Sequence, residues 1–111
     1  MLKFDNIIYA PDLGGLTDED LKWSEGVKFW IGDGFSFDED FEIQGEKLHQ
    51  SMQKLLLQLK KVKSVESVLF LGVGHHSRWP HEDLELILKK FSMDENLHYL
   101  VQLGFDNQII K

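Results

Sequence analysis

The chain has 111 residues, no cysteine and a formal net charge of −7. A single domain of this length buries roughly two-thirds of its unfolded surface, so it can fold without disulfides or a structural metal. The absence of cysteine excludes disulfides, thiolate nucleophiles and cysteine-based zinc or iron–sulfur sites, and it makes a reducing cytoplasm the expected compartment.

The negative charge is concentrated in the first part of the chain. Residues 1–46 contain twelve acidic and three basic residues, a balance of −9, whereas residues 47–111 contain seven acidic and nine basic residues, a balance of +2. Phosphate contacts need a basic face, so we expect no binding to nucleic acid. An acidic half attracts a basic protein partner, although a solvated surface that aids solubility explains it equally well.

The apolar segments are too short for a membrane. The longest run, residues 68–73, falls far below the roughly 20 residues of a spanning helix. Residues 1–10 include Lys3 and Asp5 and alternate too strongly to form a signal peptide. We therefore expect a soluble, cytoplasmic protein that does not associate with membranes.

The first segments predict one strand and one short helix. Residues 2–9 alternate as a strand, with a bulge where the alternation breaks at Asn6. Proline and two glycines mark residues 11–15 as a loop. Thr17-Asp18-Glu19-Asp20 is a capping box that predicts a short helix through Trp23, and an ordered acidic loop is the alternative.

The next segment predicts a hairpin. Alternation over residues 27–32 predicts a half-buried strand with Trp30 on its outer face. Gly32-Asp33-Gly34 is a turn signal, and residues 35–43 continue with period two, which predicts an antiparallel return strand. Three consecutive carboxylates, residues 38–40, are poor in a strand interior and favour a bend or a sheet edge.

The organising element of the prediction is a long helix over residues 45–63. Its apolar residues share one stripe at helical spacing: Leu48, Met52, Leu55, Leu56, Leu59 and Val62. Gly45 is an acceptable N-cap, and lysines near the end suit the helix dipole. The run that follows, residues 65–73, is apolar on both faces and predicts a central strand.

The remaining segments predict two shorter helices. Pro80 suits a first helical position, and Leu84, Ile87, Leu88 and Phe91 form a buried stripe after it. Ser92-Met93-Asp94-Glu95 is a second capping box, which favours another helix ending at Gly104; a strand over residues 98–105 is the alternative. Residues 105–111 predict a short terminal strand.

Together these elements predict one α+β domain spanning residues 1–111. Its sheet is antiparallel or mixed, with about four to five strands, and the long helix and two shorter helices pack on it.

No stretch of the sequence contains a strong catalytic or metal-binding motif. His75, His76, His81 and Glu82 are metal-ligand types at close spacing, but the spacing matches no zinc motif, and a loop without a site is the better interpretation. The acidic runs lack the order of a calcium loop. We expect no catalytic residues, no metal and no cofactor; a small enzyme that uses the loop from His75 to His81 is an alternative.

The tryptophans offer two interpretations. Trp23, Trp30 and Trp79 are many for a chain of this length. They predict either a second packed face under the helices or aromatic anchors at a protein interface, where tryptophan is enriched.

A family resemblance follows from the order of these segments. Ile31-Gly32, a short acidic and glycine-containing gap, and then Asp40-Phe41-Glu42-Ile43 resemble the eighth-numbered family of bacterial immunity proteins. The Pro11-Asp12 loop and the downstream central strand with two short helices fit the same plan. Such proteins protect cells from polymorphic or contact-dependent toxins, many of which are nucleases with basic clefts.

The resemblance implies a partner, a cognate basic toxin, and a non-enzymatic role in neutralising it. An acidic protein of this size would block such a cleft by placing carboxylates where phosphates bind. The expected partner-binding residues combine the acidic runs with two tryptophans: Asp18, Glu19, Asp20, Trp23, Trp30, Asp38, Glu39 and Asp40. A small phage or regulatory adaptor protein with an acidic face is a further alternative.

Overall fold

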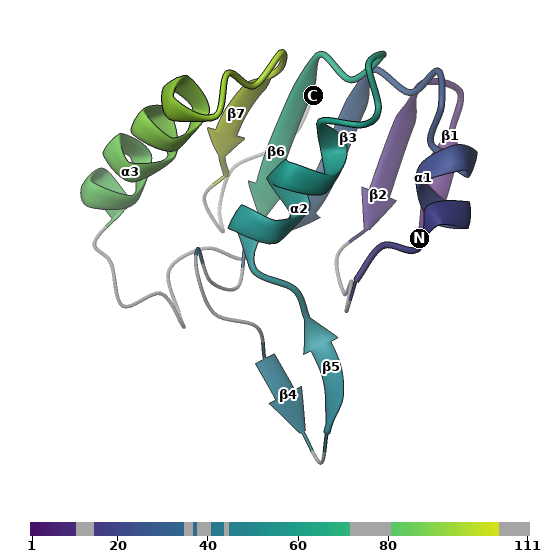
Figure 1. Ribbon diagram of the computed structural model, residues 1–111, viewed down its shortest axis with the longest axis horizontal. Helices are drawn as coiled ribbons and strands as arrows, with labels where there is room; N and C mark the ends of the chain where they lie inside the picture. Colours follow the sequence, from purple (N-terminus) through teal and green to yellow (C-terminus); the bar gives the residue numbers. More distant parts are fainter. Residues whose placement is uncertain (11–14, 35–36, 38–40, 44, 72–80, 105–111) are drawn as a thin grey trace.

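The computed structural model describes residues 1–10, 15–34, 37, 41–43, 45–71 and 81–104 (Figure 1). These residues form a five-stranded mixed sheet, a separate two-stranded hairpin and three helices, which confirms the predicted α+β class. In chain order the elements are β1 (Leu2–Phe4), β2 (Ile7–Ala10), α1 (Asp18–Trp23), β3 (Phe29–Asp33), β4 (Phe41–Ile43), β5 (Glu46–His49), α2 (Met52–Leu59), β6 (Ser67–Leu71), α3 (His81–Asp94) and β7 (Leu100–Leu103).

The large sheet adds its strands in one direction. Its order is β1-β2-β3-β6-β7; β1 and β2 are antiparallel, and all other neighbours are parallel. Each parallel step passes through one helix: α1 between β2 and β3, α2 between β3 and β6, and α3 between β6 and β7. Because such crossovers share one hand, helices that follow strands added in one direction lie on the same face of the sheet (Figure 1).

The core lies between this face and the helices. Ile8, Trp30 and Val68 are neighbours in register across β2, β3 and β6, and each is at most 1% exposed. The helices contribute Leu21 from α1, Met52, Leu55, Leu56 and Leu59 from α2, and Leu84 and Leu88 from α3. Trp30 therefore faces the core and not the outer side of its strand, while its neighbour Phe29 is exposed.

The predicted central strand is confirmed as an interior strand. β6 lies between β3 and β7, and Val68 and Phe70 are fully buried beneath the helices. On the other side of the strand Leu69 and Leu71 are half-buried. An apolar run on both faces therefore indicated the interior position correctly but overstated how well the second face is covered.

The predicted long helix over residues 45–63 begins too early. Gly45, with φ of 80°, lies in the turn between β4 and β5, and residues 46–49 form β5. The helix starts after Ser51, whose hydroxyl accepts a hydrogen bond from the Lys54 backbone N–H at 3.3 Å. Serine is a stronger N-cap than glycine, and pairing with β4 satisfies the preceding backbone, so only the part of the stripe from Met52 to Leu59 is helical.

The strand pairing also differs from the prediction. β3 pairs in parallel with β2 and β6, whereas β4 forms its antiparallel hairpin with β5 (Figure 1). Residues 2–9 form two antiparallel strands and not one bulged strand, because the chain turns at Asp5, whose φ is 48°. A short polar side chain such as aspartate tolerates this left-handed conformation.

The C-terminal helix prediction is wrong, and the alternative strand is present. α3 continues through Ser92 to Asp94, so the second capping box lies at the end of a helix, with Glu95 in the turn that follows, and does not start one. Asn96, with φ of 52°, turns the chain, and β7 then adds parallel to β6. A strand here pairs with the free edge of β6, a long-range interaction that a local capping signal does not report. The predicted strand in residues 105–111 lies outside the described residues.

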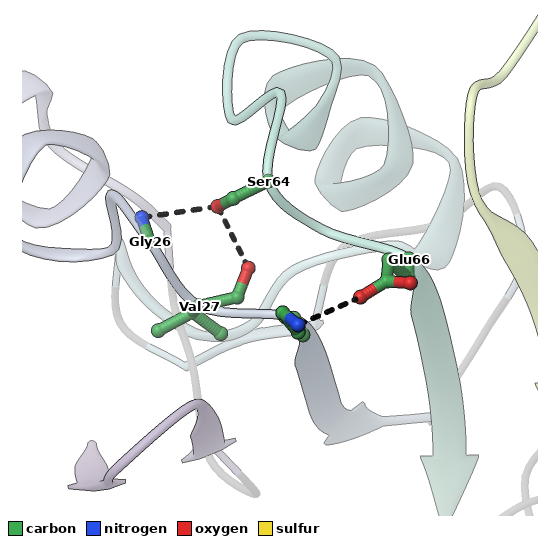
Figure 2. Close-up of polar contacts among 5 residues, drawn as sticks. Gly26, Val27, Ser64 and Glu66 are labelled. Carbon is green, nitrogen blue, oxygen red and sulfur yellow. Dashed lines mark hydrogen bonds and ion pairs between the residues drawn. The ribbon is translucent and has the colours of Figure 1, made fainter.

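One hydroxyl makes two of the hydrogen bonds that join two loops at one end of the sheet. The Ser64 hydroxyl accepts a hydrogen bond from the Gly26 N–H at 3.0 Å and donates one to the Val27 carbonyl at 2.7 Å (Figure 2). Beside it, the Lys28 ammonium lies 3.9 Å from the Glu66 carboxylate, and both side chains are exposed. Together with the Lys28 carbonyl, which accepts backbone hydrogen bonds from Glu66 at 2.7 Å and Ser67 at 3.2 Å, these contacts join the loop that enters β3 to the loop that enters β6.

Candidate functional site

The first part of the candidate site is α1, which forms for the reason the sequence indicates. The Thr17 hydroxyl accepts a hydrogen bond from the Asp20 N–H at 3.1 Å, and the Asp20 carboxylate accepts one from the Thr17 N–H at 3.0 Å. This is the predicted capping box, and it satisfies two backbone donors at the start of the helix. Leu21 anchors the helix in the core.

The three predicted carboxylates of α1 are not equivalent. Asp18 and Glu19 are exposed in the first helical turn, where a negative charge suits the helix dipole. Asp20 is half-buried and bound to its own cap. Two of these three carboxylates are thus available to a partner, whereas the third maintains the helix that presents them.

Trp23 lies at the end of the same helix and is 45% exposed. The Lys3 ammonium donates a hydrogen bond to the Trp23 carbonyl at 2.7 Å and lies 5.3 Å from the centre of the indole ring. A cation at this distance from an indole ring is attracted by the π system. Lys3 of β1 therefore contacts both the backbone and the ring of a tryptophan whose side chain remains accessible.

A shallow hollow of about 350 Å³ lies beside α1. It is lined by Asp18, Glu19, Leu21, Lys22, Glu25 and Lys61. We define the α1 surface as the exposed residues of this region that α1 and its C-terminal turn contribute: Asp18, Glu19, Lys22, Trp23 and Glu25. Three carboxylates and one lysine give this surface a net negative charge.

The other predicted partner-binding residues divide into two groups. Trp30, at 1% exposed, lies in the core under the helices and offers no surface to another protein. Its position matches the interpretation of tryptophan as part of a packed face under the helices, and we do not retain it in the contact surface. Asp38, Glu39 and Asp40 lie outside the described residues.

For the alternative of an enzyme site in the loop from His75 to His81, residues 75–80 lie outside the described part of the structure, and His81 is the first residue of α3. Within the described ranges, no group of three or more histidine, aspartate or glutamate side chains is arranged to hold a metal ion. A hollow of about 430 Å³ between α3 and β7 has four polar lining residues: Glu85, Lys89, Ser92 and Gln102. None of these four side chains is an imidazole that could serve as a general base for the serine.

The two residues before β7, His98 and Tyr99, contact backbone carbonyls at and just after the C-terminal end of α2. Tyr99 donates its phenolic hydrogen to the Leu56 carbonyl, and the His98 Nε2 lies 3.0 Å from the Val62 carbonyl. Leu56 is one of the last four residues of α2, whose carbonyls lack intrahelical partners. Burial raises the pKa of the Tyr99 phenol above its ordinary value. These contacts are structural, since Tyr99 is buried.

Sequence reasoning missed the second face of the large sheet. On the side of the sheet opposite the helices, the strand register places ten residues in two rows across all five strands, and at the β7 edge Leu100 and Gln102 also line the hollow beside α3. We call this surface the open face: Phe4, Ile7, Phe29, Ser67 and Leu100 form one row, and Leu2, Tyr9, Ile31, Leu69 and Gln102 form the other. The alternation over residues 27–32 contains the signal, but a strand with Trp30 on its outer face places Phe29 and Ile31 on the inner face.

Comparison with known proteins identified no matching family model, no matching curated relative and no matching solved structure. Among the helices of the described chain, none has the length and apolar character to cross a membrane.

Proposed function

We propose that this chain is a non-enzymatic immunity protein that binds and neutralises a cognate bacterial toxin of basic charge, with a nuclease as the expected class. The observation that supports the proposal is the α1 surface, where exposed carboxylates line a hollow and an accessible tryptophan lies on the same helix. The fold presents these side chains on a capped helix anchored by Leu21, so the surface is ordered before binding.

The physical argument is charge substitution. A nuclease cleft binds phosphates through basic side chains, and carboxylates such as Asp18 and Glu19 satisfy the same side chains while excluding the nucleic acid. Their field also accelerates encounter with a basic protein. Trp23 adds an apolar anchor of the type that dominates binding energy at protein interfaces. Lys22 on the α1 surface and Lys61 on the other side of the hollow add positive charges among the carboxylates. They favour a partner that has carboxylates at matching positions.

To identify the partner, the chain is used to capture proteins from the source cells at low salt. The bound protein is then identified by mass spectrometry and purified. Association kinetics with that protein then test the surface. The double substitution Asp18→Lys with Glu19→Lys reverses two exposed charges, and we expect the association rate at low salt to fall by about tenfold and its salt dependence to flatten.

The matched control reverses two exposed aspartates on α3, Asp83→Lys with Asp94→Lys, which changes the net charge by the same amount on another helix. We expect its association rate to stay within about twofold of the unmodified chain. Equal losses from both variants would indicate that only net charge matters and would contradict the α1 surface as the contact. If cells that produce the captured protein gain no protection from the chain, the immunity role is wrong.

A further inference from the structure

The open face exposes several large apolar side chains to water. Six of its residues are between 38% and 67% exposed: Leu2, Phe4, Ile7, Tyr9, Phe29 and Leu100. Five of them lie together on the neighbouring strands β1, β2 and β3, and Leu100 lies on β7, beyond β6, whose residues on this face, Ser67 and Leu69, are half-buried. Large continuous apolar patches on soluble proteins mark interaction sites, whereas single exposed apolar residues are ordinary.

The chemistry of the open face restricts its occupant. Eight of its ten residues are apolar, the other two are Ser67 and Gln102, and none carries a charge. This contrasts with a chain whose formal net charge is −7. An uncharged face selects neither a basic nor an acidic partner, and the surface that matches it best is another uncharged apolar sheet.

The exposed area is sufficient for a reversible dimer. An aromatic side chain presents roughly 150–250 Å² when free, so the three exposed aromatic residues contribute roughly 300 Å². At about 25 cal/mol per Å², the burial energy of a whole aliphatic side chain corresponds to an area of about 60–120 Å². When its exposed aliphatic residues are added to the aromatic ones, the open face exposes roughly 500 Å² per copy. Two copies would bury roughly 1,000 Å², which is about the lower limit for a specific interface.

We propose that the open face binds the open face of a second copy of this chain, in a two-fold symmetric dimer of stacked sheets. A two-fold interface is self-complementary, so one apolar face serves both partners. Two twisted sheets pack with their inner faces about 10 Å apart, and side chains such as Phe29 then interdigitate. The α1 surface lies on the helix-covered side and remains outside this interface, so the dimer is independent of the proposed function.

Sedimentation velocity of the full chain, from micromolar to millimolar concentration, tests the dimer. Leu100→Glu places one carboxylate per copy in the apolar face, and Leu86→Glu introduces the same change on α3 at a comparably exposed leucine, 67% against 59%. We expect the unmodified chain to dimerise reversibly. Leu100→Glu should raise the dimer dissociation constant at least tenfold, and Leu86→Glu should leave it within about twofold.

Phe4→Glu, on edge strand β1, provides a second variant in case Leu100→Glu disturbs α3, and it should weaken the dimer to a similar degree. Circular dichroism establishes that each variant is folded. A chain that stays monomeric at all concentrations would overturn the proposal, as would a dimer that Leu86→Glu weakens and folded Leu100→Glu and Phe4→Glu do not. A monomer that floats with phosphatidylcholine vesicles would assign the face to a lipid surface and would also overturn it.

Discussion

The two faces of the large sheet are built from the same strands, and adjacent residues on one strand have opposite surroundings. On β3, Trp30 is 1% exposed beneath the helices, whereas Phe29 is 42% exposed on the open face. The difference does not come from hydrophobicity, because both side chains are large and aromatic. It comes from the crossover connections, which place all three helices of the described chain on one side. An apolar residue in a strand therefore indicates a surface that needs cover, without indicating whether the same chain supplies it.

The largest expected effect on stability comes from comparing substitutions on the two faces of β3. Trp30→Ala removes a fully buried indole and leaves a cavity, so we expect the free energy of unfolding to fall by about 3–5 kcal/mol. Phe29→Ala, one residue away, should cost about 1 kcal/mol or less when measured at concentrations below dimer formation. Urea denaturation of both variants measures the difference. Similar losses would mean that the open face is covered within the monomer.

A smaller effect concerns the loops that hold β3 and β6 together. Ser64→Ala removes both hydrogen bonds of the Ser64 hydroxyl and leaves the Val27 carbonyl without this donor. We expect a loss of about 1–2 kcal/mol in unfolding free energy. Ser67→Ala, a half-buried serine on the open face, is the control and should change stability by less than about 0.5 kcal/mol. Equal effects of the two substitutions would show that the Ser64 hydrogen bonds add no stability beyond that of an ordinary half-buried serine.

The smallest effect at neutral pH is expected at Tyr99, and it becomes larger in alkali. Because burial raises the phenol pKa of the folded state, the contribution of Tyr99 to stability is fully present below the ordinary pKa of 10.0 and decreases as pH rises above it. Above that pH we expect stability to fall by roughly 1 kcal/mol per pH unit from this group alone.

Tyr99→Phe should cost about 1 kcal/mol at neutral pH, because the Leu56 carbonyl loses its donor, and should abolish that part of the alkaline loss. Thermal unfolding of both proteins between pH 8 and about pH 11 measures the slope, a range that spans the ordinary tyrosine pKa. If the two curves ran parallel throughout, the alkaline loss would have to come from other groups, such as the lysines.

The candidate site was predictable where its geometry is local. The capping box at Thr17 and the exposed charges of Asp18 and Glu19 are confirmed, because four consecutive residues contain the whole interaction. The position of Trp30 was not predictable in the same way, since alternation shows that it opposes Phe29 but not which of the two lies under the helices. The open face required the register of five strands from distant parts of the chain.

The sequence by itself determined the α+β class, the helix stripe from Met52 to Leu59 and the interior position of β6, because each depends on short-range periodicity and composition. Only the tertiary structure decided that residues 46–49 form a strand, that residues 100–103 pair with β6, and that the three helices of the described residues share one side of the sheet. The reason is physical: backbone hydrogen bonds within a helix join residues four apart, whereas those within a sheet join strands at any separation. Local signals therefore compete with pairings that become visible only when the whole chain has folded.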